Sequence, residues 1–444
     1  MTSKQSSALL IGADPYPILA CLEAGIKPVV VYAPGLNDWG YIQLPSEVEA
    51  VFAEDTSSIE SVLCSLQRAG LTNGEFSYIY TSDEMALLTA ATIARVLDIP
   101  SALTPDVAIR FRDKWLQKNI VANAGIEVAM SQVIEDIYTL NPEEIANFDK
   151  AVLKPIMGAG THKTSLTEGR RELIDICAEY RQAGISQRTF VLEEFIAGSE
   201  WVVDGVVFDG ELQFFSVRSY TEPCLSAVSS NAAVQAEVFD PVTDSDIYKR
   251  VRPVVEGALR SLGLSSGVFH MELFYQEQTG KLVFGECAAR AGGGLTHEVM
   301  KFKFGVDLSL AAARCAMGIN PRIDPSVRSE VVGTTFLSNR PGVLISYPSP
   351  EEIGGLPGVE HFRLELPYGF RMVDILAGTT EGVGQVMLSG GTRDEFRSRR
   401  SFVTQWFDER LVVVPAQATN QDLRKWQNAH WPESVSFFQP YSSS

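Results

Sequence analysis

The sequence predicts an α/β protein organised in about three lobes, and three observations support this fold class. Apolar strands alternate with amphipathic helices over roughly the first hundred residues, which is typical of a doubly wound parallel sheet. The pattern becomes rich in β-strands between about residues 201 and 290. The chain has 444 residues, more than a single hydrophobic core usually holds.

The N-terminal region shows this alternation in order. Residues 8–32 have the pattern of a strand, a helix and a second, β-branched strand. A helix is expected over residues 57–69, with Ser57 and Glu60 as a capping box. Residues 76–80 are the next expected strand, and the helix after it carries an apolar stripe of Leu87, Ala90, Ala91, Ala94 and Leu97.

The whole chain divides into four segments. Residues 1–112 would form the N-terminal domain, 113–205 a small lobe, 206–330 a larger β-rich lobe, and 331–444 a C-terminal lobe with a polar tail. Two prolines near residue 100 mark the first boundary. Further strands are expected at Ala151–Pro155, Thr189–Phe195, Trp201–Phe208, Glu211–Val217, Val268–Tyr275 and Lys281–Ala288.

The composition is that of an ordinary globular protein, because 45% of the residues are hydrophobic and 21% are charged. The 37 lysines and arginines face 55 aspartates and glutamates, which gives a net charge of −18. Phosphate backbones and anionic lipids would repel such a chain, so we expect neither a nucleic-acid nor a membrane partner. The six cysteines contain no CxxC pair, which favours reduced thiols and a cytoplasmic protein.

An acidic hairpin is the most informative segment. The runs 268–275 and 281–288 alternate in polarity and flank a turn that contains Gly280. If the loop holds an odd number of residues, Glu272 lies opposite Glu286 and both side chains point to one face. The same face would carry His270, Ala288 and Arg290.

Two carboxylates directly opposed on a ladder repel each other, and a fold tolerates them with solvent or a cation between them. Mg²⁺ is often held by one or two carboxylates together with substrate phosphates. Glu272 and Glu286 are therefore candidate metal ligands. The alternative is a solvated outer face, on which two glutamates need no metal.

A glycine triplet follows the hairpin. Arg290 leads into Ala291-Gly-Gly-Gly294, where the backbone can approach a ligand closely and offer N–H groups to an anion. An arginine at this place can bind a carboxylate or a phosphate with two hydrogen bonds. The alternative is a flexible loop with a surface arginine.

A lysine lies near the end of the apolar strand Ala151-Val-Leu-Lys-Pro155, and the loop Ile156-Met-Gly-Ala-Gly-Thr-His-Lys163 follows it. Lysine is rarely buried without a partner. A lysine beside a glycine-rich loop suits polyphosphate, although a turn with a snorkelling lysine is an equal alternative. Upstream, Lys114 lies near the start of a helix expected to continue to Gly125.

The strand that ends before Gly198 offers backbone groups at its edge. Such an edge can bind the Watson–Crick face of a purine, and Glu200 beyond it can accept hydrogen bonds from ribose hydroxyls. Three exposed acidic residues around a turn are the alternative.

Taken in order, these segments resemble the ATP-grasp superfamily, and within it the carboxylate–amine ligases that include the L-amino acid (dipeptide) ligases. The resemblance spans about residues 75–300 and implies an ATP-grasp fold, with a two-lobed α+β core between an N-terminal domain and a C-terminal lobe. The residues that carry it are Asp113-Lys114, Lys154-Pro155, Gly158-Ala-Gly160, Glu193-Glu-Phe-Ile196, Gly198-Ser-Glu200, Glu272, Glu286 and Arg290.

The resemblance implies a nucleotide site in which Lys114 and Lys154 contact the phosphates of ATP. Adenine would lie against Glu193, and Glu200 would hold the ribose. The adjoining cofactor-binding residues would be Glu194 and Ile196, with a covering loop of Gly158, Ala159, Gly160 and Thr161.

The resemblance also implies that Glu272 and Glu286 bind Mg²⁺ or Mn²⁺ and that Arg290 is the catalytic residue that stabilises the reacting oxyanions. One motif departs from the superfamily pattern Glu-x-Asn-x-Arg, because this chain has Glu286-Cys-Ala-Ala-Arg290. Ala288 cannot ligate a metal, so a second metal would lack one side-chain oxygen, which Glu286 or water would have to replace.

The implied activity is that of an ATP-dependent ligase. A carboxylate, expected to belong to an amino acid, is activated as an acyl phosphate and joined to an amine, expected to be a second amino acid, with release of ADP and phosphate. The alternatives are a ligase that loads an amino acid onto a carrier protein, a carboxylase-type subunit, and a nucleotide-binding protein without catalysis. A homodimer is an open option.

Four residues are candidate substrate contacts. Arg218 would hold a carboxylate and Glu222 an ammonium group, and an ordinary loop is the alternative for both. Gly293 in the glycine triplet and His297 shortly after it are the other two.

Overall fold

The computed structural model describes residues 6–33, 44–72, 76–230, 232–338, 340–372, 382–417, 419 and 421. The polar tail expected at the C-terminus lies almost entirely outside these residues. None of the helices in these ranges is long and apolar enough to cross a membrane.

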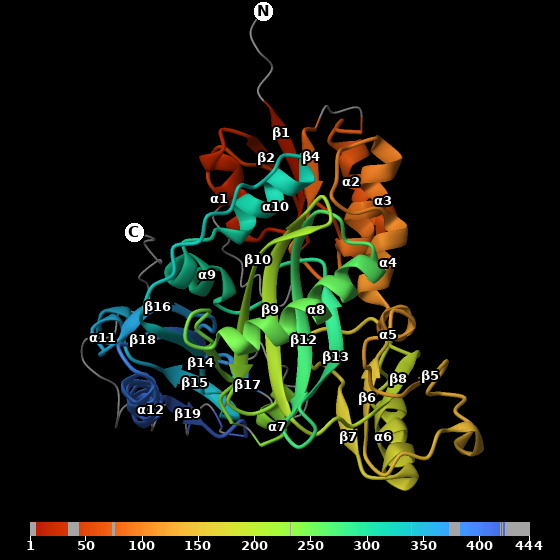
Figure 1. Ribbon diagram of the computed structural model, residues 1–444, viewed down its shortest axis with the longest axis vertical. Helices are drawn as coiled ribbons and strands as arrows, with labels where there is room; N and C mark the ends of the chain where they lie inside the picture. The colour runs from red at the N-terminus through yellow and green to blue at the C-terminus, as the bar shows by residue number, and fades with distance from the viewer. Residues whose placement is uncertain are drawn as a thin grey trace, which may run out of the picture.

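The N-terminal domain is built on a four-stranded sheet of order β3-β2-β1-β4, in which every pair is parallel, as predicted. Its strands are β1 (Ser7–Ile11), β2 (Lys27–Tyr32), β3 (Glu49–Phe52) and β4 (Tyr78–Tyr80). The helices α2 (Ile59–Arg68) and α3 (Leu87–Leu97) cover one face, and α1 (Pro15–Glu23) covers the other together with α10 (Leu308–Ala316) from far along the chain (Figure 1).

The first helix cap differs by one residue from the prediction. Ser58 is the N-cap of α2 and accepts a hydrogen bond from the Ser61 amide, whereas Ser57 binds Asp55. The expected cap at Ser57 was wrong because Asp55 captures that serine in a local turn.

The small lobe is an antiparallel sheet of order β5-β8-β6-β7, which packs on α6 (Arg170–Gln182). Its strands are β5 (Ser131–Ile134), β6 (Ala151–Pro155), β7 (Ser165–Thr167) and β8 (Phe190–Glu194). Two helices, α4 (Pro105–Arg112) and α5 (Lys114–Asn123), lead from the N-terminal domain into this lobe.

An eight-stranded sheet of order β13-β12-β9-β10-β11-β14-β18-β16 forms the centre of the molecule (Figure 1). This sheet joins segments that were expected to form separate lobes. Its strand β9 crosses the expected boundary at residues 205–206, and three of its strands lie beyond residue 330. Its strands are β9 (Ser199–Phe208), β10 (Glu211–Tyr220), β11 (Gln235–Val238), β12 (Gly267–Gln276), β13 (Lys281–Ala288), β14 (Val331–Leu337), β16 (Val359–Leu364) and β18 (Gly384–Gly390).

Helices and a small sheet complete the larger lobes. One face of the central sheet packs on α8 (Ser245–Leu262), where Phe269, Met271 and Leu273 enter the core as the strand alternation predicts. A three-stranded sheet lies beside it, made of β15 (Gly342–Ser346), β17 (Arg371–Met372) and β19 (Val412–Val414). The remaining helices are α7 (Cys224–Ser229), α9 (Thr296–Phe304), α11 (Pro350–Gly354) and α12 (Arg393–Arg410).

The two glutamates of the acidic hairpin pair as predicted, but the loop and the strand register differ from the prediction. Glu272 lies opposite Glu286, as expected. The loop, however, has an even number of residues, because Gln276 pairs with Lys281, and the register shifts by one residue at Gly285. A β-bulge therefore restores the alignment that the expected odd-membered loop would have given.

Candidate active site

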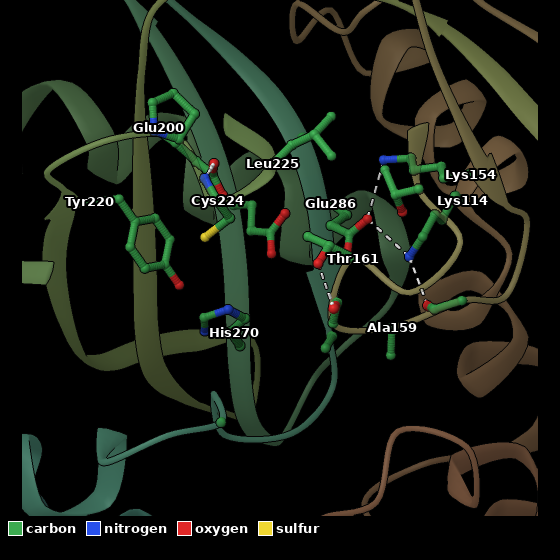
Figure 2. Close-up of a pocket in the computed structure, with 18 of the residues that line it drawn as sticks. Lys114, Lys154, Ala159, Thr161, Glu200, Tyr220, Cys224, Leu225, His270 and Glu286 are labelled. Carbon is green, nitrogen blue, oxygen red and sulfur yellow. Dashed lines mark hydrogen bonds and ion pairs between the residues drawn. The ribbon is translucent and has the colours of Figure 1, made fainter. Parts of the chain in front are cut away.

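A cavity of about 530 Å³ lies between the small lobe and the central sheet, with one wall from the N-terminal domain. Of the residues predicted to form the site, all but Glu222 and His297 line it. Figure 2 shows Lys114 and Lys154 at one end of this cavity with Glu286 beside them, and Tyr220, Cys224 and Glu200 towards the other end.

Two lysines from different elements converge on one carboxylate. Lys114 Nζ lies 2.9 Å from Glu286 Oε2 and donates to the carbonyl of Gly158 at 3.0 Å. Lys154 Nζ lies 3.3 Å from the same Glu286 oxygen and 3.0 Å from Glu193. Asp113 fixes the first lysine, because it caps α5 and so sets where that helix begins.

A third lysine, Lys118, was missed by the sequence analysis. It lies one turn after Lys114 on α5, is 1% exposed, and forms an ion pair with Glu193 at 3.1 Å. Its ammonium group also donates to the carbonyl of Gly285 at the hairpin bulge. Glu193, expected beside adenine, therefore holds two lysines, the buried Lys118 and the half-buried Lys154. Burial opposes ionisation, but Lys118 and Lys154 hold the pKa of Glu193 below its usual range.

The opposed pair of glutamates has unequal proton affinities. Burial and then the charge of Glu286 raise the pKa of Glu272 to about 8. Burial acts in the same direction on Glu286, but Lys114 and Lys154 outweigh it and hold the pKa of Glu286 well below its usual range. At neutral pH the pair therefore carries one negative charge, on Glu286, and Glu272 keeps its proton. A cation between the two side chains would favour loss of that proton.

The acidic pair fits a magnesium ion bound jointly with a substrate. Among the described residues, no group of three or more His, Cys, Asp and Glu side chains is placed to hold a metal ion. Two carboxylates without further protein ligands suit Mg²⁺, which completes its octahedral shell with water and phosphate oxygens. Ala288, opposite His270 on the same hairpin, adds no ligand.

Arg290 is fixed from two sides. Its Nε donates to Glu84 at 2.6 Å and its Nη1 donates to the carbonyl of Ala291 at 2.7 Å. Glu84 also pairs with the buried Arg112. Burial would raise the pKa of Glu84, but these two arginines hold it below its usual range. The N-terminal domain thus supplies the carboxylate that orients the predicted catalytic arginine.

Asp204 organises the floor of the cavity behind the hairpin. It is fully buried on β9, lies 2.5 Å from Arg218 and 2.8 Å from His270 Nδ1, and accepts a hydrogen bond from the Gly292 amide. Burial opposes its ionisation, but Arg218 and His270 hold the pKa of Asp204 below its usual range. Gly292 is required here, since a Cβ at this residue would lie 2.6 Å from His270.

Glu200, the residue expected to hold ribose, is 5% exposed and accepts a hydrogen bond from the Cys224 amide at 2.8 Å. Burial raises the pKa of Glu200 to about 7. This contact ties the first residue of α7 to the start of β9, so α7 forms part of the cavity wall. Sequence patterns gave no sign of this helix.

The covering loop between β6 and β7 needs unusual backbone conformations. Gly160 and Thr161 have φ values of 61° and 60°, in the left-handed region. Gly158 packs on Pro155, where an added Cβ would lie 3.2 Å away. The loop lines the cavity next to the lysines.

Two predicted substrate residues lie elsewhere. His297 stacks on Tyr16 of the N-terminal domain, with ring centroids 4.2 Å apart, and does not line the cavity. Glu222 precedes α7 and also does not line it. The first helical turn after the glycine triplet turns His297 towards α1 and away from the cavity.

Several known proteins resemble this chain in sequence. A family model described as an ATP-grasp domain matches residues 151–298. The chain is 24% identical to an L-arginine-specific L-amino acid ligase of Bacillus subtilis over 344 residues, which cover 76% of this chain and 78% of that protein. It is 30% identical to carnosine synthase 1 of Mus musculus over 190 residues, which cover 41% of this chain and 22% of that protein.

A solved structure extends the likeness to the whole fold. The crystal structure of an L-amino acid ligase from Bacillus licheniformis superposes with a TM-score of 0.74 at 18% identity. The superposition covers 93% of this chain and 100% of that one.

Proposed function

We propose that this chain, which belongs to the ATP-grasp superfamily and is an ATP-dependent C–N ligase, joins the carboxylate of one amino acid to the amino group of another. The observation that carries the proposal is the convergence of Lys114 and Lys154 on Glu286, directly opposite Glu272, in one cavity. Cations for a polyphosphate and carboxylates for a divalent metal meet at that point.

The lysines bind the phosphates of ATP. Their present partner, Glu286, is a side chain that bound phosphate oxygens would replace, because phosphate carries more charge and offers more acceptors. Exchange of partners would free Glu286 for a metal ion. The glycine loop beside Lys114 then covers the phosphates and excludes water, which would hydrolyse an activated intermediate.

Glu272 and Glu286 hold Mg²⁺ or Mn²⁺ in this proposal. The ion supplies charge neutralisation at the phosphoryl group that is transferred. Ala288 would add no ligand, so water and the phosphates of ATP would have to supply the remaining oxygens.

The reaction has two balanced steps. A carboxylate oxygen of the first amino acid attacks the γ-phosphorus, the bond to ADP breaks, and an acyl phosphate forms. The uncharged amino group of the second amino acid then attacks the acyl carbon. Phosphate leaves, and the attacking nitrogen loses a proton. Arg290 stabilises the oxyanion in both steps, and Glu84 orients its guanidinium group in advance.

The test is release of ADP and phosphate from the purified chain with Mg²⁺ across a matrix of amino-acid pairs, with mass spectrometry of the products. Release that needs two amino acids and yields a dipeptide supports the proposal. Release that needs a carrier protein or bicarbonate supports the rival activities. Cytoplasmic location and a homodimer stay predictions, which fractionation and light scattering would test.

A further inference from the structure

We propose that one of the two amino-acid substrates has an uncharged, mainly apolar side chain, which binds in a neutral compartment at the far end of the cavity. This inference rests on the proposed function and deepens it. The compartment is bounded by Tyr220, Leu225, Val234, Leu295 and Phe336, which all line the cavity.

The register of the central sheet places the compartment. Tyr220 on β10 pairs with Ala236 on β11, which pairs with Thr334 on β14. Phe336, two residues on and so on the same face, pairs with Gln385 on β18. A continuous floor therefore runs across the sheet from the acidic hairpin to β18.

The chemistry of this floor changes along its length. Its first part, on β13, β12, β9 and β10, is lined by Glu286, Glu272, Glu200 and Arg218. Beyond Arg218, the described residues that line the cavity from α7, β11, β14 and β18 are all neutral. Asp204 already balances the charge of Arg218, and Glu365 behind Gln385 is paired with Arg363.

The neutral end is a packed apolar surface. Cys224, Ala227 and Val234 form a buried cluster against which Tyr220 and Phe336 pack. The Phe336 amide donates to the carbonyl of Val234, which holds β14 next to the end of β11. Leu225 lies above this floor on α7, whose first residue is tied to Glu200 (Figure 2).

A charged side chain placed among Val234, Leu295 and Phe336 would lose its water. The charged groups that border the compartment, Arg218 and Glu200, are already bonded to Asp204 and to the Cys224 amide. The cost of losing this water is far larger than the gain from any apolar contact, so the compartment selects against lysine, arginine, aspartate and glutamate. The selection differs from that of the Bacillus subtilis relative, whose name specifies L-arginine.

The first experiment measures kcat/KM for ADP release with the full chain, ATP and Mg²⁺. Amino acids of similar size are compared at each substrate position, with leucine against aspartate and asparagine, and methionine against lysine and glutamate. We expect one position to prefer the apolar member of each set over the charged one by about a hundredfold or more. Equal use of charged side chains, or a preference for them, at both positions overturns the inference.

The second experiment moves the preference. Phe336→Ala enlarges the compartment, and we expect kcat/KM for leucine to fall on the order of tenfold to a hundredfold while tryptophan is less affected. Leu225→Glu adds a carboxylate, and we expect lysine and arginine to gain relative to leucine. Phe402→Ala, on an exposed residue of α12, is the matched control and should leave the substrate profile unchanged. An unchanged profile in both cavity variants overturns the inference.

Thermal stability with ADP and Mg²⁺ separates this inference from the proposed function. Apolar amino acids that raise the Tm of a chain without ligase turnover would support the compartment and overturn the ligase. Turnover with a Tm that rises only for charged amino acids would support the ligase and overturn the compartment. Tm values of each variant with ADP and Mg²⁺ also show that it is folded.

Discussion

Lys154 Nζ lies 3.3 Å from Glu286 Oε2, although the two residues belong to different sheets and are 132 positions apart. Lys114 Nζ lies 2.9 Å from the same oxygen. One carboxylate thus joins the small lobe to the central sheet. It is also the carboxylate proposed to bind the metal.

Glu286→Gln should therefore abolish most activity. The amide keeps the size of the side chain but loses the charge that holds two lysines and a divalent ion, so we expect turnover to fall by at least about a hundredfold. We also expect ADP with Mg²⁺ to raise the Tm less than in the unaltered chain. The control is Glu277→Gln, on the exposed loop of the same hairpin. Full turnover in the Glu286 variant would remove the metal assignment.

Lys118 and Glu193 should be strongly coupled. Because both are buried and paired, removing Glu193 leaves Lys118 without its carboxylate, whereas removing Lys118 leaves Glu193 paired with Lys154. We therefore expect Glu193→Gln to cost about 3–5 kcal/mol of unfolding free energy and Lys118→Met to cost less. The double variant should lose less than the sum, with a coupling of about 0.5–3 kcal/mol in urea titrations. The exposed pair Lys249 and Asp246 is the comparison, with a coupling below about 0.5 kcal/mol. Additive effects at Lys118 and Glu193 would contradict the buried ion pair.

The metal-free protein should lose stability as the pH rises from about 4.5 to 8. The raised pKa of Glu272, about 8 against an ordinary 4.5, means that the folded state keeps a proton that the unfolded chain loses in this window. The stability that this proton provides is fully present below about pH 4.5 and is lost as the pH rises through about 8. Glu200, with a pKa of about 7, acts in the same direction.

Glu272→Gln tests this pH dependence. It mimics the protonated side chain, so we expect a flatter profile and a gain of about 1–4 kcal/mol at pH 8.5, measured by urea unfolding, although ligase turnover is lost. A variant whose stability falls as steeply as that of the parent would show that Glu272 does not carry the proton.

Gly292→Ala should damage the site without touching a substrate. Its Cβ would lie 2.6 Å from His270 Nδ1 and 2.7 Å from Asp204 Oδ1, so we expect a loss of about 1–3 kcal/mol and a fall in turnover of about tenfold or more. Gly293→Ala meets no atom within 4 Å and should keep its stability. Lower kcat/KM in the stable Gly293 variant would mark the predicted substrate contact. Normal stability of Gly292→Ala would contradict the close packing.

Local patterns predicted most of the fold and the opposed pair of glutamates. Period-two alternation predicted that Glu272 and Glu286 share a face, although the bulge at Gly285 and not an odd-membered loop produces this pairing. Strand–helix alternation predicted the parallel N-terminal sheet. The boundaries were harder to predict, because composition changes near residues 205 and 330 while the hydrogen-bonded sheet continues through both.

The missed residues depend on contacts between distant segments. Lys118 has the pattern of a solvated lysine on an amphipathic helix. Its partner Glu193 lies on β8, far along the chain. Asp204 lies within a buried strand whose apolar neighbours give no sign of a polar cluster. His297 follows a glycine loop that suggests a ligand, yet its stacking on Tyr16 depends on how the N-terminal domain packs on α9.

The bulge at Gly285 decides how this hairpin can change in length during evolution. Loss of Gly285 alone would leave Glu286 opposite Glu272, since the strands would then pair without a shift, but Lys118 would lose its carbonyl acceptor. An insertion elsewhere on β13, between Gly285 and the loop, would instead turn Glu286 towards the core. Homologues with a shorter hairpin should therefore lack both this glycine and the buried lysine on the facing helix.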